Sequence, residues 1–92
     1  MPSSSVGVEL TLDAQDEALL ARLRTLRSSI ARDEQVPAYV VFADRTLLEM
    51  AVRRPKNLSS LGEIRGVGPV KLERYGARFL DAVRAADETE AA

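Results

Sequence analysis

The spacing of apolar residues is the feature that most constrains this chain, because it repeats every three or four positions in the two longest segments. Such a repeat places apolar side chains on one face of an α-helix. In the C-terminal segment that face comprises Leu72, Tyr75, Gly76, Phe79, Leu80, Val83 and Ala86. In the N-terminal segment it comprises Leu19, Leu23, Leu26 and Ile30. The pattern predicts two amphipathic helices, one from Thr11 or Asp13 to about Arg32 and one opening at Pro69.

The segment "VPAYVVF", residues 36–42, is rich in β-branched residues, which favour strands. It has no partner strand elsewhere in the chain, and a lone strand leaves its backbone polar groups unpaired. The segment is therefore expected to be a short helical turn or an extended connector packed on the core.

Two further helices are predicted between this segment and Pro69. One spans residues 45–54, capped by Asp44 and ended by Pro55. The other is short and spans residues 58–64. Asn57 and Ser59 are its alternative capping residues. The expected fold is an all-α bundle of four to five short helices.

Length and composition limit the chemistry. The chain of 92 residues is long enough for one domain with one modest core. It contains no cysteine and no histidine, which excludes disulfides, Cys/His zinc sites and thiol or imidazole catalysis. No pairing of carboxylates with a base or a metal-ligand pattern stands out, so neither catalytic residues nor a cofactor are expected. No apolar run reaches the roughly 20 residues of a membrane span, and the first residues lack the features of a signal peptide.

Three regions follow from these patterns. Residues 1–10 are expected to form a disordered linker, residues 11–86 the helical domain, and residues 87–92 a disordered acidic tail. Charge is unevenly divided between them. Residues 37–84 carry nine basic and five acidic side chains, a net +4, whereas residues 1–36 sum to −2 and residues 85–92 to −3. The middle of the chain is therefore basic, although the whole chain has a formal net charge of −1.

The stretch "IRGVGPVKLERYGARFL", residues 64–80, poses the question of a phosphate site. It lacks the Gly-x-x-x-x-Gly-Lys-Ser/Thr spacing of a P-loop and the third glycine of a dinucleotide fingerprint. It does fit a helix-hairpin-helix element, in which Gly66 and Gly68 are expected to adopt positive φ, to let the chain turn sharply and to let two helices approach. The free N–H groups at the start of the second helix, with Lys71 one turn in, could then meet a backbone phosphate. The alternative is a turn that only joins and packs two helices.

Other candidates for nucleic-acid contact are basic or aromatic. Tyr39 could stack on an unpaired base, or its ring could cap the core with its hydroxyl in water. Tyr75 lies on the apolar face of the last helix and is assigned to the core. The basic candidates could contact phosphates or could simply form a solvated surface. They are Arg45, Arg53, Arg54, Lys56 and Arg65, together with Lys71.

Two stretches, "VPAYVVFADRTLLEMA" and "IRGVGPVKLERYG", give the chain a family resemblance over roughly residues 16–86. Together they resemble the HRDC domain, the helicase-and-RNase-D C-terminal domain found in RecQ-family DNA helicases. By these stretches the chain looks nearer to bacterial RecQ, and the C-terminal domain of an RNase D-type exonuclease is the alternative. Ala38 departs from the family, whose motif often has a second proline there.

The resemblance implies a non-catalytic, monomeric five-helix domain that binds single-stranded or partly duplex DNA weakly and tunes substrate choice. The ATP-dependent motor would lie in other domains, and the protein would be bacterial, cytoplasmic and nucleoid-associated. The resemblance also implies that Tyr39 contacts DNA. The alternative is a docking module that binds the helicase core of the parent chain or another partner through acidic residues. These are Asp13, Asp16 and Glu17, with Asp33 and Glu34 at the other end of the first helix.

Overall fold

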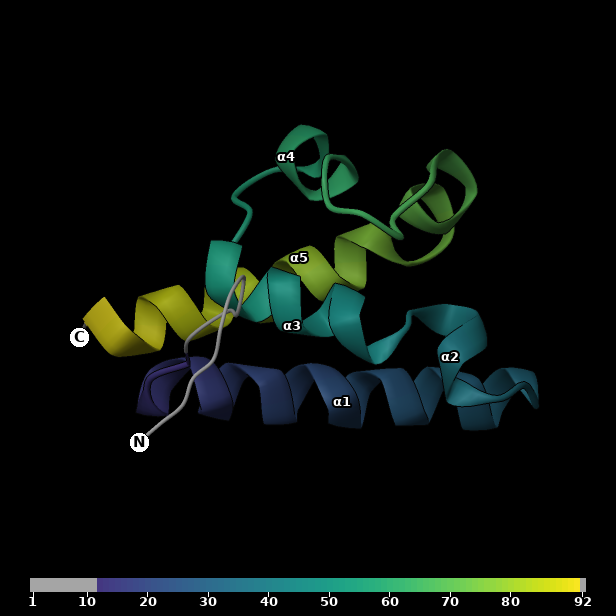
Figure 1. Cartoon of the computed structure of the whole chain (residues 1–92), viewed down its shortest axis with the longest axis horizontal. Helices are drawn as coiled ribbons and strands as arrows, with labels where there is room; N and C mark the ends of the chain where they lie inside the picture. Colours follow the sequence, from purple (N-terminus) through teal and green to yellow (C-terminus); the bar gives the residue numbers. More distant parts are fainter. Residues whose placement is uncertain (1–11, 92) are drawn as a thin grey trace, which may run out of the picture.

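The computed structural model of the protein describes residues 12–91, and these fold entirely into α-helices and connecting turns. The five helices are α1 (Ala14–Glu34), α2 (Ala38–Val41), α3 (Asp44–Arg53), α4 (Leu58–Gly62) and α5 (Pro69–Ala91). Figure 1 shows α1 along one side of the molecule, with α2, α3 and the C-terminal part of α5 packed on it and with α4 and the start of α5 on the opposite side. The prediction of an all-α bundle is confirmed.

Helix α1 begins with a capping box. The Asp13 carboxylate accepts a hydrogen bond from the Asp16 N–H at 2.8 Å, and the Asp16 carboxylate accepts one from the Asp13 N–H at 3.4 Å. Asp13 is therefore the cap; Thr11, the other predicted capping residue, lies outside the described residues. The helix ends at Glu34, where Gln35 takes a left-handed conformation with φ of 58°.

Within residues 36–42 the chain forms the short helix α2, which was one of the two alternatives expected for this segment. It buries Val41 and Phe42 and leaves Tyr39 and Val40 exposed. Phe42 lies at the centre of the core, with its ring centroid 4.9 Å from Phe79 and 5.9 Å from Tyr75, both edge-to-face.

The prediction that Asp44 caps α3 is wrong. Ala43 occupies the cap position without a side-chain hydrogen bond, and Asp44 is the first residue of the helix. Its carboxylate lies 2.8 Å from a guanidinium nitrogen of Arg27 on α1, and Arg27 also donates to the Phe42 carbonyl oxygen at 2.9 Å. The Asp44 carboxylate therefore forms an ion pair with α1 instead of capping α3.

Asn57 is the residue that caps α4, through a capping box with Ser60. Pro69 opens α5 as predicted, because its missing N–H is not needed in a first helical turn. The prediction of a disordered tail from residue 87 is wrong for residues 87–91, which continue α5. No helix within residues 12–91 is long and apolar enough to cross a membrane.

Candidate nucleic-acid interface

The hairpin between α4 and α5 is fixed to α3 by a buried threonine. Thr46 donates a hydrogen bond through Oγ1 to the Arg65 carbonyl oxygen at 3.0 Å, and Thr46 is only 4% exposed. Gly66 follows with φ of 96°, and a Cβ at this position would collide with Thr46 Oγ1. Glycine is required at position 66 by both backbone conformation and space.

Gly68 differs from Gly66. Its φ lies outside the left-handed region, and a Cβ built on it would meet no atom within 4 Å. The expectation that both glycines supply positive φ is therefore wrong for Gly68. The open space beside its backbone lies next to the start of α5, where the first helical hydrogen bond runs from the Leu72 N–H to the Gly68 carbonyl oxygen at 2.8 Å. The amides of Val70 and Lys71 precede that bond in the first turn of the helix.

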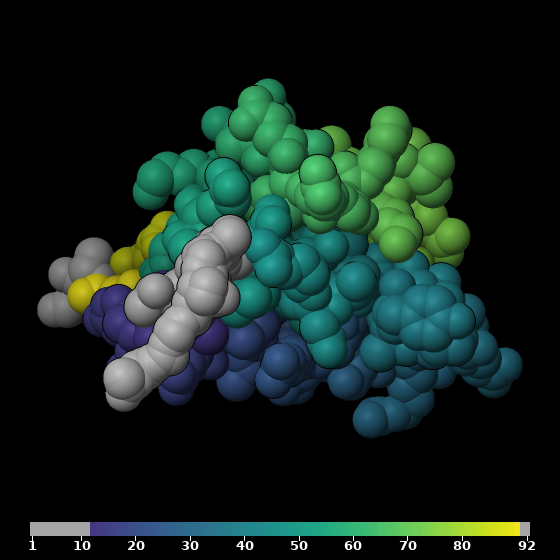
Figure 2. All heavy atoms as spheres, in the orientation of Figure 1, coloured from purple at the N-terminus to yellow at the C-terminus, as the bar shows by residue number. Residues whose placement is uncertain are grey.

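The start of α5 lies beside α2. Lys71 holds its ammonium nitrogen 5.9 Å from the centroid of the Phe42 ring, and Phe42 is the residue that ends α2. Figure 2 shows the two surfaces meeting at one end of the molecule, α2 in blue-teal below and the hairpin with the start of α5 in green above.

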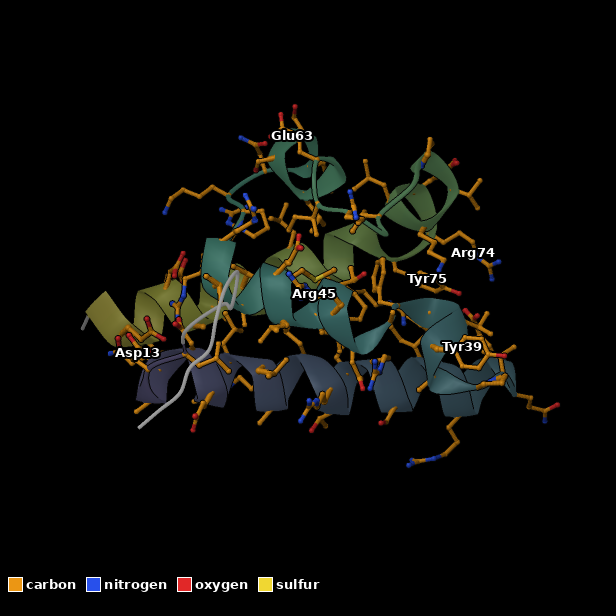
Figure 3. The ribbon with its side chains drawn as sticks, viewed as in Figure 1. Asp13, Tyr39, Arg45, Glu63, Arg74 and Tyr75 are labelled. Atoms are coloured by element: carbon orange, nitrogen blue, oxygen red, sulfur yellow. The ribbon has the colours of Figure 1, made fainter. Side chains whose placement is uncertain are left out.

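Tyr39 projects from α2 with 70% of its surface exposed, the largest exposure among the large hydrophobic residues of the described chain. Its ring makes no aromatic contact within residues 12–91. The alternative in which the Tyr39 ring caps the core is therefore wrong. Figure 3 shows it at the end of the molecule where Arg74 and Tyr75 also lie.

Tyr75 shows the opposite arrangement and confirms its assignment to the core. It is 4% exposed and donates its hydroxyl to a Glu34 carboxylate oxygen at 2.7 Å. That hydrogen bond and the burial of the ring raise the pKa of Tyr75. Arg74 pairs with the same carboxylate at 3.4 Å. Because the Tyr75 ring is buried and its hydroxyl is bonded to Glu34, Tyr39 is the tyrosine whose ring is accessible to a ligand.

A shallow basic hollow lies between α3 and the hairpin. Arg45, Arg53 and Arg65 line it together with Glu49 and Glu63. Arg45 and Arg53 face Glu49 at 3.5 and 3.8 Å, but their side chains are 60% and 64% exposed while that of Glu49 is 13% exposed. The two guanidinium groups therefore cover the carboxylate and present positive charge outward.

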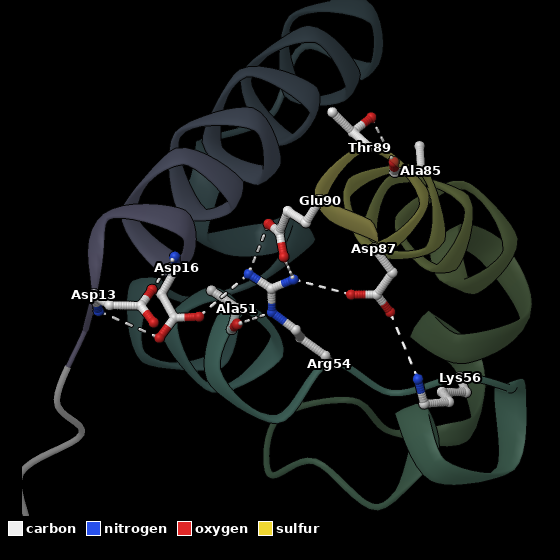
Figure 4. Close-up of polar contacts among 9 residues, drawn as sticks. All are labelled: Asp13, Asp16, Ala51, Arg54, Lys56, Ala85, Asp87, Thr89 and Glu90. Carbon is white, nitrogen blue, oxygen red and sulfur yellow. Dashed lines mark hydrogen bonds and ion pairs between the residues drawn. The ribbon is translucent and has the colours of Figure 1, made fainter. Parts of the chain in front are cut away.

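Arg54 follows Arg53 directly but is enclosed by carboxylates (Figure 4). Its guanidinium donates to Glu90, to Asp87 at 2.9 Å and to Asp16 at 3.3 Å, and its side chain is 16% exposed. The hydrogen bond to Glu90 is the main reason why the pKa of Arg54 lies above its usual value. These contacts join the end of α3 to the end of α5 and the start of α1. They also hold the part of α5 beyond residue 86 against α3 and α1.

Lys56 is 79% exposed, and its ammonium nitrogen lies 3.7 Å from an Asp87 carboxylate oxygen. Both Arg54 and Lys56 are thus paired with acidic side chains. These two residues share one end of the molecule with Asp16, Asp87 and Glu90.

Comparison with known proteins identifies the family. Residues 16–83 match the HRDC domain. The chain belongs to the HRDC domain family. Its HRDC domain is 46% identical over 69 residues to the ATP-dependent DNA helicase RecQ of Haemophilus influenzae, covering 75% of this chain and 11% of that protein. It is also 46% identical over 69 residues to the ATP-dependent DNA helicase UvrD2 of Mycobacterium tuberculosis, covering 75% of this chain and 10% of the relative.

A solved structure supports the same assignment. The D. radiodurans RecQ HRDC domain 3 superposes with a TM-score of 0.73 at 37% identity, covering 76% of this chain and 92% of that chain. The present HRDC domain spans about a tenth of the length of the curated helicases it matches.

The structure thus separates Arg54 and Lys56, which are paired with carboxylates of α1 and α5, from the other predicted contact residues of this HRDC domain. Among the others, Arg45, Arg53 and Arg65 line one hollow, and Lys71 lies over the ring of Phe42, three residues after Tyr39. The name Tyr39 face is used below for Tyr39, Arg45, Arg53, Arg65, Gly66, Gly68 and Lys71. Val70 was not among the predicted contact residues, but it lies in the first turn of α5 with 67% of its surface exposed. The signal was its place directly after Pro69, where a helix presents its first amides.

Proposed function

We propose that this HRDC domain is a non-catalytic part of an ATP-dependent DNA helicase and binds single-stranded or partly duplex DNA weakly through the Tyr39 face. The observation that carries the proposal is the exposed Tyr39 ring beside the basic start of α5. An exposed aromatic ring has no folding role that requires exposure, whereas stacking on an unpaired base is worth about 1–3 kcal/mol per base.

Phosphate contacts would come from the rest of the Tyr39 face. The amides at the start of α5 point out of the helix, the helix dipole favours an anion there, and Lys71 adds a point charge. Open space at Gly68 lets a phosphate approach the backbone. Arg45 and Arg65 extend the positive surface along the hollow, and such contacts position a strand without reading its sequence.

The parent helicase would supply ATP hydrolysis and unwinding from its other domains, in the cytoplasm with the chromosome. The domain's own contribution would be to bias which DNA structures the motor engages. Weak binding suits that role, because non-specific affinities of about 10⁻⁴–10⁻⁶ M allow rapid exchange between sites.

Fluorescence anisotropy of a labelled single-stranded oligonucleotide tests the proposal. Tyr39→Ala should weaken binding by about ten-fold, and Tyr39→Phe, the matched control, should retain most of it because the ring is kept. Binding should also weaken steeply with salt. Equal affinity of Tyr39→Ala and wild type, or affinity independent of salt, would contradict the proposal.

A second candidate function is docking onto the helicase core of the parent chain. One observation favours it: α1 and α5 bring Asp16, Asp87 and Glu90 together beside an open, mainly apolar hollow lined by Ala14, Ala18 and Ala86. A basic and apolar patch on the core would complement this end. Mixing the domain with the isolated core should then give a DNA-independent complex, and no complex at high protein concentration would exclude it.

A further inference from the structure

The outer face of α1 is basic, although residues 1–36 as a whole have a net charge of −2. Residues 18–32 contain four arginines and no acidic residue, because all six acidic residues of positions 1–36 lie outside this stretch. Arg27 is directed inward, toward Asp44 and the Phe42 carbonyl. The remaining three arginines of the stretch are exposed.

Two of these arginines share a shallow hollow with hydroxyl side chains. The hollow is lined by Arg24, Thr25, Ser28, Ser29 and Arg32, all of them exposed, and this set is here called the α1 ridge. Arg24, Ser28 and Arg32 follow each other at intervals of four, so they form one row about 12 Å long on the helix.

The α1 ridge differs from the hollow on α3 in its counter-charges. On α3, Glu49 lies between Arg45 and Arg53 and partly neutralises them. Within residues 12–91, no carboxylate lies within 4.0 Å of the guanidinium groups of Arg24 or Arg32. The ridge therefore offers its two guanidinium groups to an external anion.

The composition of the ridge favours nucleic acid over protein as that partner. Protein interfaces depend on buried aromatic or aliphatic anchors, and none of the large exposed apolar side chains of the described chain lies on α1. Arginine and serine or threonine hydroxyls are common partners of phosphate oxygens. Since the ridge has no ring to stack on a base, it would contact phosphates only, and duplex DNA presents phosphate charge most densely.

We propose that the α1 ridge is a second DNA-binding surface that holds the phosphate backbone of duplex DNA. The ridge lies on the exposed side of α1, because Leu19, Leu23 and Ile30 on the other side of the helix are buried in the core. Figure 1 shows α2 and α3 packed on one side of α1. The domain would then engage duplex with the ridge while the Tyr39 face engages a single strand, so the proposal extends the function proposed above and specifies the partly duplex substrate.

Anisotropy titrations of the full chain with a blunt-ended duplex, repeated over a range of salt concentrations, test the ridge. Arg24→Gln with Arg32→Gln should weaken duplex binding by about ten-fold and lower the slope of log affinity against log salt by about 2. Arg24→Lys with Arg32→Lys should keep most of the affinity. Lys56 and Arg84 line one hollow with Asp87 and Glu88 at the acidic end of the molecule. Lys56→Gln with Arg84→Gln removes the same charge there and should leave duplex binding within about two-fold, which separates local contact from net charge.

The outcomes separate the two proposals. If the Arg24/Arg32 variant matches wild type on duplex, the ridge proposal is overturned, whatever Tyr39→Ala does to single-strand binding. If Tyr39→Ala has no effect on single strands while the Arg24/Arg32 variant loses duplex binding, the ridge stands and the Tyr39 face falls. No binding of either DNA by wild type overturns both. A polyglutamate peptide of equal charge serves as a further competitor. If it binds the ridge as tightly as duplex DNA does, the partner of the ridge would be an acidic protein segment and the proposal would be overturned.

Discussion

Arg53 and Arg54 are neighbours in the chain, yet they belong to different environments. Arg53 is 64% exposed with one carboxylate at 3.8 Å, whereas Arg54 is 16% exposed and hydrogen-bonded to three carboxylates from α1 and α5. The helix end between them causes the difference, because Arg54 adopts a left-handed conformation with φ of 50° that turns it toward α5. A basic residue is available to an anionic ligand only when the fold leaves it unpaired or weakly paired.

The largest expected effect is on Arg54. Arg54→Gln should lower the free energy of unfolding by about 3 kcal/mol, because it leaves Asp16, Asp87 and Glu90 close together without their cation. Arg53→Gln, the matched control, should change it by no more than about 0.5 kcal/mol, as expected for a surface ion pair. Urea denaturation followed by circular dichroism measures both, and equal stability of the two variants would show that the network around Arg54 contributes little.

The two hairpin glycines offer a second comparison. Gly66→Ala should cost about 2 kcal/mol or more of stability, because the new Cβ meets Thr46 and the residue has positive φ. Gly68→Ala should leave stability within about 0.5 kcal/mol but weaken single-strand binding, because a methyl group would occupy the approach to the first amides of α5. Thermal unfolding and anisotropy distinguish these effects. Unchanged DNA affinity of the Gly68→Ala variant would show that the backbone of this turn does not contact DNA.

The acidic end of α5 should show an intermediate effect. A chain ending at Ala86 lacks Asp87 and Glu90, and its free energy of unfolding should fall by about 1–2 kcal/mol through loss of their hydrogen bonds to Arg54. Its affinity for single-stranded DNA should not fall, because the Tyr39 face is untouched. If truncation instead abolished single-strand binding, the division between the two ends of the molecule would be wrong.

The smallest effect concerns Tyr75, whose raised pKa predicts a specific pH dependence. Because the folded state holds the neutral phenol more strongly than the unfolded state does, the extra stability is fully present below about pH 10 and is lost as the pH rises further. Tyr75→Phe should lose about 1 kcal/mol at neutral pH and should show less of this alkaline loss. Urea titrations at neutral and alkaline pH provide the measurement, and identical alkaline losses in both proteins would exclude the Glu34 hydrogen bond as its cause.

The fold was largely predictable because it follows from local patterns. Apolar spacing located α1 and α5, Pro69 marked the start of a helix, and Asn57 was among the predicted caps. Contacts between distant residues were not predictable. The capping role assigned to Asp44 failed because Arg27, 17 positions earlier, pairs with it. The tail assigned as disordered is helical to residue 91, and its carboxylates pair with Arg54 across more than 30 positions.

The candidate site shows the same limit. Residue type selected Tyr39 and the basic residues as candidates, and their contact with DNA stays a prediction. The structure adds that the Tyr39 side chain is exposed. Residue type could not separate Arg53 from Arg54, because pairing depends on which carboxylates the fold brings near. It also concealed the α1 ridge, since summing the charge of residues 1–36 merged a basic helix face with acidic helix ends.

Two-dimensional amide NMR during titration with a short single-stranded oligonucleotide at low salt tests the central claim most directly. We expect salt-sensitive shifts at Tyr39, Arg65 to Lys71 and Arg45, with the amides of Arg54, Lys56 and Asp87 nearly unchanged. Shifts centred on Arg54 and Asp87, with Tyr39 silent, would contradict the account, because they would show that DNA displaces the carboxylates and binds at the acidic end.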